Sequence, residues 1–394
     1  MSFPLEFPLF KTSMTFKLEL IYSIIFSLLW RCYTGFDSHE LLVSGIYTQF
    51  LALAIVLLYG WVDKKIKTPL PNICGSQNGP PITSPRIKLS DGRFLAYKEK
   101  GVSKEKAKYK IMVVHGFDSS KDFNLPASQE LVEELGIYFL LFDRAGYGES
   151  DPNPMRSVKS EAFDIQELAD QLEIGSKFYI IGSSMGCYPL WSCLKHIPCS
   201  IAGMTLVSPV VNFWWPSLPA KLSKMVYKRL LKQDQWAFRV AHYAPRLLYW
   251  WLTQKWFPSL SALEWCLEIP SSQDIETLKK MQGTPQPDQE KTRQQGVFES
   301  LHRDLIVGFG KWDFDPMKLT NPFPHNESSV HIWQGYEDKM VPVELQRYVS
   351  QKLSWIRYHE VPNAGHLLVH EPVFADAILR ELLLGEKPSF SLAE

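Results

Sequence analysis

Residues 178–187 read FYIIGSSMGC, and this stretch decides the fold. Its first four residues form a short apolar run without interruption, which is typical of a strand buried on both faces. A Gly-x-Ser-x-Gly pentapeptide at 182–186 follows directly and leads into an apolar helical stretch. At such a strand-to-helix turn the serine hydroxyl is lifted above the sheet, and the small flanking residues permit a strained backbone. Ser184, rather than Ser183, is therefore the predicted nucleophile.

Similar apolar runs occur on both sides of this stretch, and helical patterns separate them. Between two of the runs, Ala162, Ile165, Ala169 and Leu172 recur at the spacing of a helix face. The alternation of strand and helix predicts an α/β fold with a mostly parallel sheet and helices on both of its faces. The predicted strands are 111–114, 137–142, 178–181, 204–207, 329–333 and 355–361.

Two further patterns mark the beginning and the middle of this sheet. Asp91-Gly92 lies between two alternating runs in 86–97 and predicts a β-hairpin, so the sheet begins antiparallel. The alternation then stops between 209 and 328, where the chain is helical in pattern, interrupted by prolines and rich in aromatic residues. Seven of the 13 tryptophans fall between Phe213 and Trp265. We interpret 209–328 as a lid inserted between two parts of one core, 86–208 and 329–394.

The N-terminal 67 residues differ from this body because they contain two long apolar stretches. Leu41–Val62 holds 22 residues without a charge, enough for a helix to cross a membrane, and Leu18–Trp30 is a weaker second span. Three lysines at 64, 65 and 67 favour a cytoplasmic body by the positive-inside rule. We expect residues 1–67 to anchor the protein in a membrane, with the endoplasmic reticulum as one candidate, and 68–85 to be a linker. A buried amphipathic lid is the alternative for the apolar segment.

Charge and cysteine content exclude several classes of protein. The chain has 42 lysine and arginine residues and 42 aspartate and glutamate residues. It therefore lacks the net positive charge that would favour binding to nucleic acid. None of the six cysteines forms a Cys-x-x-Cys pair, and we predict free thiols in a reducing compartment. No metal or dissociable cofactor is implied.

A serine hydroxyl needs a base to accept its proton, and that base needs a partner that orients it. Asp338 follows the 329–333 strand and His366 follows the 355–361 strand, so both lie where parallel strands end and open α/β sheets place their ligands. His366 is preferred over His370 because His370 falls toward the closing helix. For the acid, the rivals of Asp338 are Glu337, Asp313 and Asp315.

Negative charge develops on the carbonyl oxygen during acyl transfer, and backbone amides are its common stabilisers. One such donor is expected at Met185, the residue after the nucleophile. The second is expected at Phe117, since His115-Gly116 after the 111–114 strand lets the backbone turn near the site. His115 itself is predicted to be structural.

These motifs together resemble the α/β-hydrolase superfamily over about 86–384. The resemblance rests on the HG loop, the serine elbow, Gly-Tyr-Glu-Asp-Lys-Met-Val-Pro around Asp338 and the late Gly-His at His366, all in the family's chain order. Segments such as DRAGYGESDPNP and VNFWWP look like a plant branch of membrane-anchored members. The resemblance implies an α/β-hydrolase fold with a helical cap and a Ser-His-Asp triad.

The leading functional hypothesis is a serine hydrolase that cleaves a carboxylic ester through an acyl-enzyme. The aromatic lid and the apolar anchor both favour a lipophilic small molecule or lipid as substrate. One alternative keeps the triad but transfers the acyl group to an alcohol or amine. The other is a receptor or scaffold without catalysis, because a fold does not fix a function.

Overall fold

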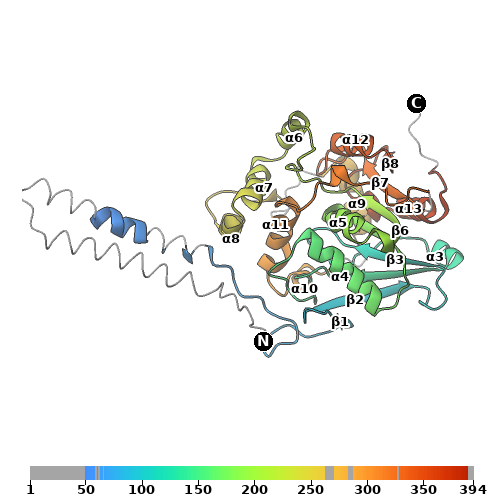
Figure 1. The fold of residues 1–394 in the computed structure, drawn as a ribbon, viewed down its shortest axis with the longest axis horizontal. Helices are drawn as coiled ribbons and strands as arrows, with labels where there is room; N and C mark the ends of the chain where they lie inside the picture. The colour runs from blue at the N-terminus through green and yellow to red at the C-terminus, as the bar shows by residue number, and fades with distance from the viewer. Residues whose placement is uncertain are drawn as a thin grey trace, which may run out of the picture. The chain divides into compact units, whose positions relative to one another are not determined.

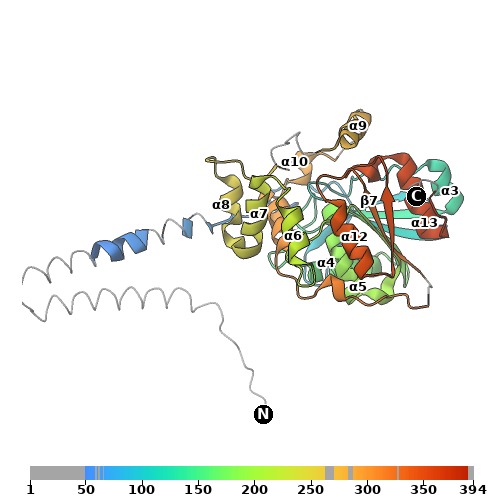
Figure 2. The same ribbon diagram turned by 90° about the horizontal axis from the view of Figure 1, so that it is seen from above.

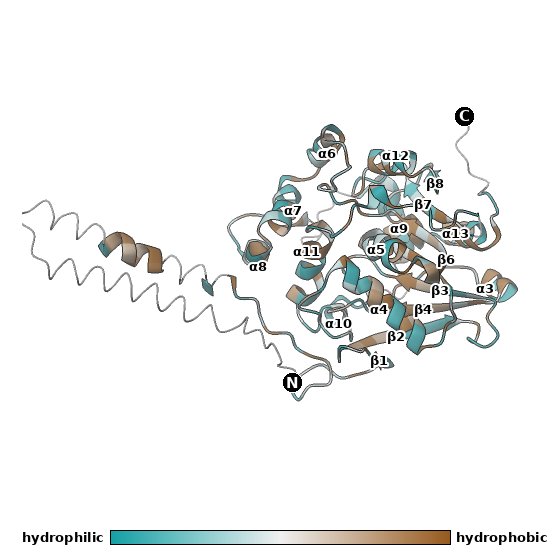
Figure 3. Ribbon diagram, in the orientation of Figure 1, coloured by the Kyte–Doolittle hydropathy of each residue, from teal (hydrophilic) through white to brown (hydrophobic). Residues whose placement is uncertain are grey.

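The computed structural model describes residues 49–57, 60, 63–64, 66–261, 270–282, 287–325 and 328–388. The chain divides into two compact units, Met1–Lys65 and Ile66–Glu394. In the first unit, residues 49–57 are helical, and most of them are hydrophobic (Figure 3). Their large apolar side chains are exposed. No helix within the described residues is long and apolar enough to cross a membrane. The expected span Leu18–Trp30 lies outside the described residues, as does much of Leu41–Val62.

The second unit is built on an eight-stranded sheet in the order β1-β2-β4-β3-β5-β6-β7-β8 (Figure 1). The pairs β1–β2 and β2–β4 are antiparallel, and every pair from β4 to β8 is parallel. The predicted fold class, a mostly parallel sheet that begins with an antiparallel hairpin, is confirmed. The strands are β1 (Arg86–Lys88), β2 (Phe94–Gly101), β3 (Tyr109–Val114), β4 (Ile137–Phe142), β5 (Phe178–Ser183), β6 (Ile201–Val207), β7 (Val330–Gly335) and β8 (Ile356–Val361).

Helices cover both faces of the sheet, as the fully apolar strands require. On one face α4 (Val158–Gln171), α5 (Tyr188–His196) and α12 (Val343–Lys352) pack into a core with the inward side chains of the strands. On the other face α3 (Gln129–Leu135) and α13 (Pro372–Leu384) form a second core. All six residues of β4 are buried, because each of its side chains points into one of these two cores.

The insertion between β6 and β7 is helical in the part that the structure describes. The helices between residues 220 and 253 lie together at one end of this unit in both views (Figures 1 and 2), and we call the insertion, residues 209–328, the cap. Several of its residues form a third core with Met185 and Tyr188, which lie directly after β5. The cap helices are α6 (Ala220–Tyr227), α7 (Lys232–Tyr243), α8 (Leu248–Thr253), α9 (Ser272–Met281), α10 (Gln289–Thr292) and α11 (Arg303–Phe309).

The segment 68–85 contains neither helix nor strand, yet its end is held by the body. The backbone amide and hydroxyl of Thr83 donate to the carboxylate of Glu149 at 2.7 and 2.6 Å. Ser84 donates to the same carboxylate, and Cys74 is buried. Cys74, Cys187, Cys193 and Cys199 are free thiols, which agrees with the prediction; Cys32 and Cys266 lie outside the described residues.

Candidate active site

Ser184 lies at a sharp turn where β5 ends and the short helical turn η1 (Ser184–Cys187) begins. Its φ of 52° is in the left-handed region, which costs free energy for any residue other than glycine. The two glycines of the pentapeptide make this turn possible. A Cβ at Gly182 would lie 2.7 Å from the carbonyl oxygen of Gly186, and a Cβ at Gly186 would lie 2.4 Å from that of Val114. The backbone strain predicted from the sequence is therefore present at Ser184.

The structure brings Ser184, His366 and Asp338 into one line of hydrogen bonds. The Oγ of Ser184 is 2.9 Å from Nε2 of His366, and Nδ1 of His366 is 2.9 Å from Oδ2 of Asp338. The other carboxylate oxygen of Asp338 accepts from the backbone amides of Met340 and Val341 at 2.9 and 2.8 Å. These bonds fix the carboxylate, so that it orients the imidazole toward the serine.

The protonation of His366 is set by two opposing effects. Burial alone would lower its pKa, but the adjacent carboxylate of Asp338 favours the imidazolium, and the resulting pKa is raised above the ordinary 6.5. A more basic imidazole is a better acceptor for the proton of the Ser184 hydroxyl.

Three of the rival residues from the sequence contact other parts of the fold. The ring of His370 packs against that of Phe123, with ring centroids 5.1 Å apart. Asp315 caps the short turn at Pro316–Lys318 by accepting from the amide of Met317. Asp313 faces His196, at 3.7 Å from its Nε2.

The loop after β3 lies against the nucleophile. A Cβ at Gly116 would come within 3.1 Å of the carbonyl oxygen of Ser183 and 3.4 Å of the Cβ of Ser184. Phe117 and Met185 both line the pocket around Ser184. His115 is buried and accepts at Nε2 from the amide of Arg144, 3.0 Å away, which fits its predicted structural role.

A buried cluster of ion pairs is hydrogen-bonded to the loop after β3 and holds it in place. Arg144 donates to the carbonyl oxygen of Gly116 at 3.0 Å and makes two bonds of 2.6 and 2.7 Å to the carboxylate of Asp304 in α11. Arg156 also binds Asp304, at 2.7 Å, and pairs with Glu161. Two guanidinium groups thus face two carboxylates, so the cluster is neutral and bidentate pairing keeps its geometry rigid.

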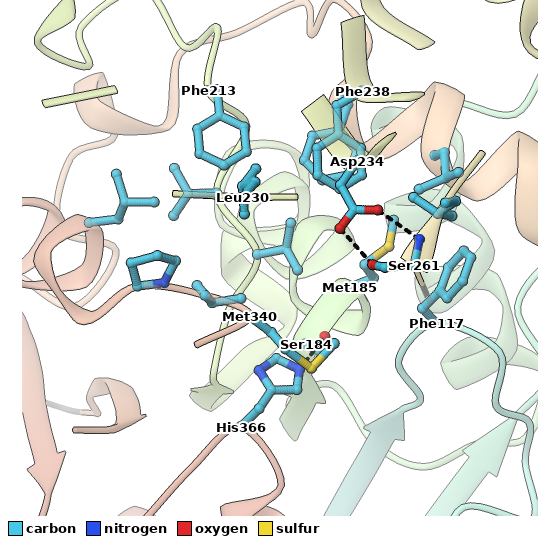
Figure 4. A pocket seen from close by; sticks show the side chains of 18 residues that line it. Phe117, Ser184, Met185, Phe213, Leu230, Asp234, Phe238, Ser261, Met340 and His366 are labelled. Carbon is cyan, nitrogen blue, oxygen red and sulfur yellow. Dashed lines mark hydrogen bonds between the residues drawn. The ribbon is translucent and has the colours of Figure 1, made fainter. Parts of the chain in front are cut away.

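Ser184 opens into a pocket between the sheet and the cap (Figure 4). The cavity measures about 120 Å³ and opens to solvent. Its lining is mostly apolar, and the polar side chains other than Ser184 and His366 are Asp234 and Ser261, which hydrogen-bond to each other. The lining residues from the cap include Phe213, Leu230, Phe238, Leu260, Leu305 and Phe309.

The family model described as "Alpha/beta hydrolase family" matches residues 111–377, which hold the serine turn, the acid and the histidine. The chain belongs to this family.

The curated relatives are more distant. The chain is 24% identical over 282 residues to "Probable lysophospholipase BODYGUARD 2" of Arabidopsis thaliana, and 22% identical over 287 residues to "Probable lysophospholipase BODYGUARD 1" of the same plant. Each match covers 67% of this chain and 56% of the relative, so the chain matches only about half the length of these proteins.

Solved structures support the fold at low sequence identity. An esterase from Exiguobacterium antarcticum is 16% identical with a TM-score of 0.51, and covers 76% of this chain and 99% of its own. The enol-lactonase from Burkholderia xenovorans LB400 is 14% identical with a TM-score of 0.52, and covers 77% and 100%. These similarities concern the α/β-hydrolase fold.

One residue at the site was missed by the sequence analysis. Asp274 in α9 of the cap is buried, and its Oδ1 accepts from the amide of Leu367, directly after His366, at 2.8 Å. A Cβ at Gly365 would lie 2.3 Å from this carboxylate, so the glycine lets Asp274 approach the histidine loop. The one sequence signal for Asp274 is Ser271, three positions before it, because a serine and an acid at this spacing predict the start of a helix.

Among the described residues, one group of side chains lies close enough to share a metal ion: His331, His359 and Glu381. The Nδ1 of His331 and the Nε2 of His359 are 3.0 Å apart, so one ring donates to the other. Glu381 is 3.3 Å from the guanidinium of Arg357. One carboxylate oxygen of Glu381, Oε2, is buried without a hydrogen-bond partner among the described residues.

Proposed function

We propose that this protein is a serine hydrolase that cleaves carboxylic esters, with Ser184 as nucleophile, His366 as general base and Asp338 as the group that orients the imidazole. The line of hydrogen bonds from Ser184 through His366 to Asp338 carries the proposal. The position of the line at the base of an apolar pocket and the membership of the α/β-hydrolase family support it.

The proposed reaction has two stages. The Oγ of Ser184 attacks the ester carbonyl carbon while Nε2 of His366 takes its proton. The oxygen of the tetrahedral intermediate carries the negative charge and accepts from the amides of Phe117 and Met185. The alcohol then leaves with the proton from His366, and an acyl-enzyme remains. Water attacks this ester in the same way, which releases the acid and restores the hydroxyl of Ser184.

The lining of the pocket favours an ester with a lipophilic part. Aromatic and aliphatic side chains of the cap surround the space in front of Ser184, and burying an alkyl chain there contributes about 0.8 kcal/mol per CH₂ group. Because the curated relatives are named probable lysophospholipases, a monoacyl phospholipid is the first lipid ester to test.

Labelling with a fluorophosphonate, which reacts with activated serines, tests the proposal. The wild type is expected to be labelled, and Ser184→Ala is expected to abolish both labelling and hydrolysis of acyl p-nitrophenyl esters. Ser183→Ala is the matched control, because the hydroxyl that hydrogen-bonds to His366 belongs to Ser184, so losing the neighbouring hydroxyl should leave labelling intact. Folded wild-type protein that resists the probe would contradict the proposal.

We also propose that the N-terminal segment holds the protein on a membrane, with the body on the cytoplasmic side. The uncharged stretch at 41–62 and the exposed apolar side chains at 49–57 support this localisation. The expected result is that the protein stays with membranes during alkaline extraction. Protease added to sealed microsomes should digest the body, and protection of the body would reverse the proposed orientation.

A further inference from the structure

The overall charge balance hides a strongly basic region of the cap. Residues 210–261 contain eight basic residues and one acidic residue, Asp234. All eight basic side chains are exposed, whereas Asp234 is buried beside the pocket. The surface of this part of the cap is therefore positive, although the whole chain is neutral. The basic residues are Lys221, Lys224, Lys228, Arg229, Lys232, Arg239, Arg246 and Lys255.

The same region exposes large aromatic side chains. Trp236, Tyr243 and Trp256 are 51%, 69% and 72% exposed. Trp236, Arg239 and Tyr243 follow one another at i, i+3 and i+7 in α7, so they share one face of the helix. The guanidinium of Arg239 lies 5.2 Å from the ring centre of Trp236. The exposed face of α7 is thus both aromatic and cationic.

Contacts between rings extend this face across α8 and the loop that follows it. The ring of Trp236 is 6.0 Å from that of Trp251, which is 4.8 Å from Phe257. Trp250 joins Trp251 to Trp256, with ring centres 6.3 and 6.1 Å apart. We call these residues, together with Lys232, Arg239, Tyr243, Arg246 and Lys255, the aromatic–basic patch. It lies far from α13 in both ribbon views (Figures 1 and 2).

We propose that the aromatic–basic patch docks on the surface of an anionic lipid bilayer. Tryptophan and tyrosine prefer the level of the lipid headgroups, where one end of the ring is apolar and the other is hydrated. Lysine and arginine next to them are attracted to anionic headgroups. Aromatic and arginine side chains are common in protein–protein interfaces as well, but lysine is depleted there. Five of the eight exposed basic residues of this region are lysines, which anionic headgroups attract, so the charge of the region favours a lipid surface over a protein partner.

The position of α7 gives this docking a consequence for the pocket. Asp234 and Phe238 on another face of α7 line the pocket in front of Ser184, and Leu230 just before the helix lines it too. A bilayer that binds the exposed face of α7 therefore contacts the same helix that forms the pocket wall. The patch belongs to the cap and shares no residue with the N-terminal segment.

A fluorescent label on the patch tests the proposal in the full-length chain. The label must report locally, because the N-terminal segment is itself proposed to bind membranes. An environment-sensitive dye on Trp256→Cys, in a background in which Cys32, Cys199 and Cys266 are serine, places the probe in the patch. The control is the same dye on Val373→Cys, which is 62% exposed at the start of α13. The readout does not depend on the activity of Ser184, so failure of the proposed hydrolase would leave this test intact.

The expected result is a blue shift of the dye at position 256 with vesicles of phosphatidylcholine and phosphatidylserine, and none at position 373. The shift should be much weaker with phosphatidylcholine alone and should be lost at about 1 M salt, where the Debye length is about 3 Å. Each basic residue near the surface contributes about fivefold in affinity. The combined change Lys232→Glu, Arg239→Glu and Arg246→Glu should therefore weaken docking more than a hundredfold.

Three outcomes would overturn the proposal. The first is folded protein whose dye at 256 does not respond to anionic vesicles. The second is an equal response to neutral and anionic vesicles, which would remove the role of the basic residues. The third is a response to polyglutamate or to DNA without one to vesicles, which would identify an acidic macromolecule as the partner.

Discussion

Two buried polar networks contact the backbone around Ser184, and they differ in whether their charged groups are already paired with an opposite charge. In the first, the carboxylate of Asp338 faces His366, which is neutral when it is ready to accept a proton. In the second, Arg144 and Arg156 face Asp304 and Glu161, so each charge already has a partner of opposite sign before any reaction. In the proposed reaction, the first network gains its ion pair only when the proton leaves Ser184. The second keeps its ion pairs throughout and holds the loop of Gly116 and Phe117.

The difference suggests a division of labour. A carboxylate whose partner charge appears during the reaction stabilises the transition state more than the ground state, which is what catalysis requires. A carboxylate that is already paired stabilises the fold and the loop geometry. Substitutions in the two networks should therefore affect different measurements, activity in the first and stability in the second.

The largest effect is expected in the first network. Asp338→Asn keeps the shape of the side chain but turns an amide toward Nδ1 of His366, which favours the wrong tautomer. We expect kcat for a p-nitrophenyl ester to fall about 10⁴-fold, while thermal unfolding changes little. A matching loss of stability would mean that Asp338 acts like Asp304 and would remove the distinction between the networks.

The next effect is expected in the second network and concerns stability. Asp304→Asn leaves two buried guanidinium groups with Glu161 alone, and breaking a buried ion pair in this way costs about 3–5 kcal/mol. Chemical denaturation measures this loss. Glu276→Gln is the control, because its pair with Lys280 is exposed and contributes little. A loss as small as that of the control would show that the cluster does not hold the fold.

Dependence on pH should separate the networks in a third way. The pKa of His366 is raised, so kcat/KM should increase with pH through a value above 6.5 as the imidazole becomes neutral. The contribution of this protonation to stability has the opposite sense: it is full below pH 6.5 and is lost as the pH rises through the raised pKa. For Asp304, burial would raise the pKa, but Arg144 and Arg156 hold it at about 2. Its contribution is full above pH 3.8 and is lost as the pH falls toward 2.

Measuring kcat/KM from pH 5 to 9 checks the prediction for His366. Measuring the free energy of unfolding from pH 2 to 9 checks the predictions for stability. In Asp338→Asn the residual activity should rise at a lower pH than in the wild type, because the neighbouring charge is gone. An unshifted profile would mean that a group other than Asp338 raises the pKa of the catalytic base.

The first network could be predicted from the sequence, and the second could not. Ser184, Asp338 and His366 each follow a strand, and parallel strands bring their carboxyl ends to one edge, so topology alone predicted that they meet. Arg144 and Asp304 meet across 160 positions of the chain, from a turn and from the cap. No local sequence pattern predicts which cap helix contacts which turn, because these contacts depend on how the cap packs on the core. For the same reason Asp274 was missed.

The smallest predicted effect concerns Asp274, which approaches the first network from the cap. Its negative charge helps raise the pKa of His366, although burial opposes this and Asp338 contributes more. Asp274→Asn can still accept from the amide of Leu367, so the loop should stay in place while the charge is lost. We expect a slightly lower kcat and an activity profile that rises at lower pH. The profile of kcat/KM against pH measures the shift.

Thr277→Val is the matched control for this change. Thr277 lies one helical turn further along α9 and donates to Glu371 at 2.8 Å, so its loss weakens the attachment of the same helix without removing a charge next to His366. If both variants shift the pH profile equally, the helix acts by holding the loop. A shift in Asp274→Asn alone shows that the cap contributes charge to the first network.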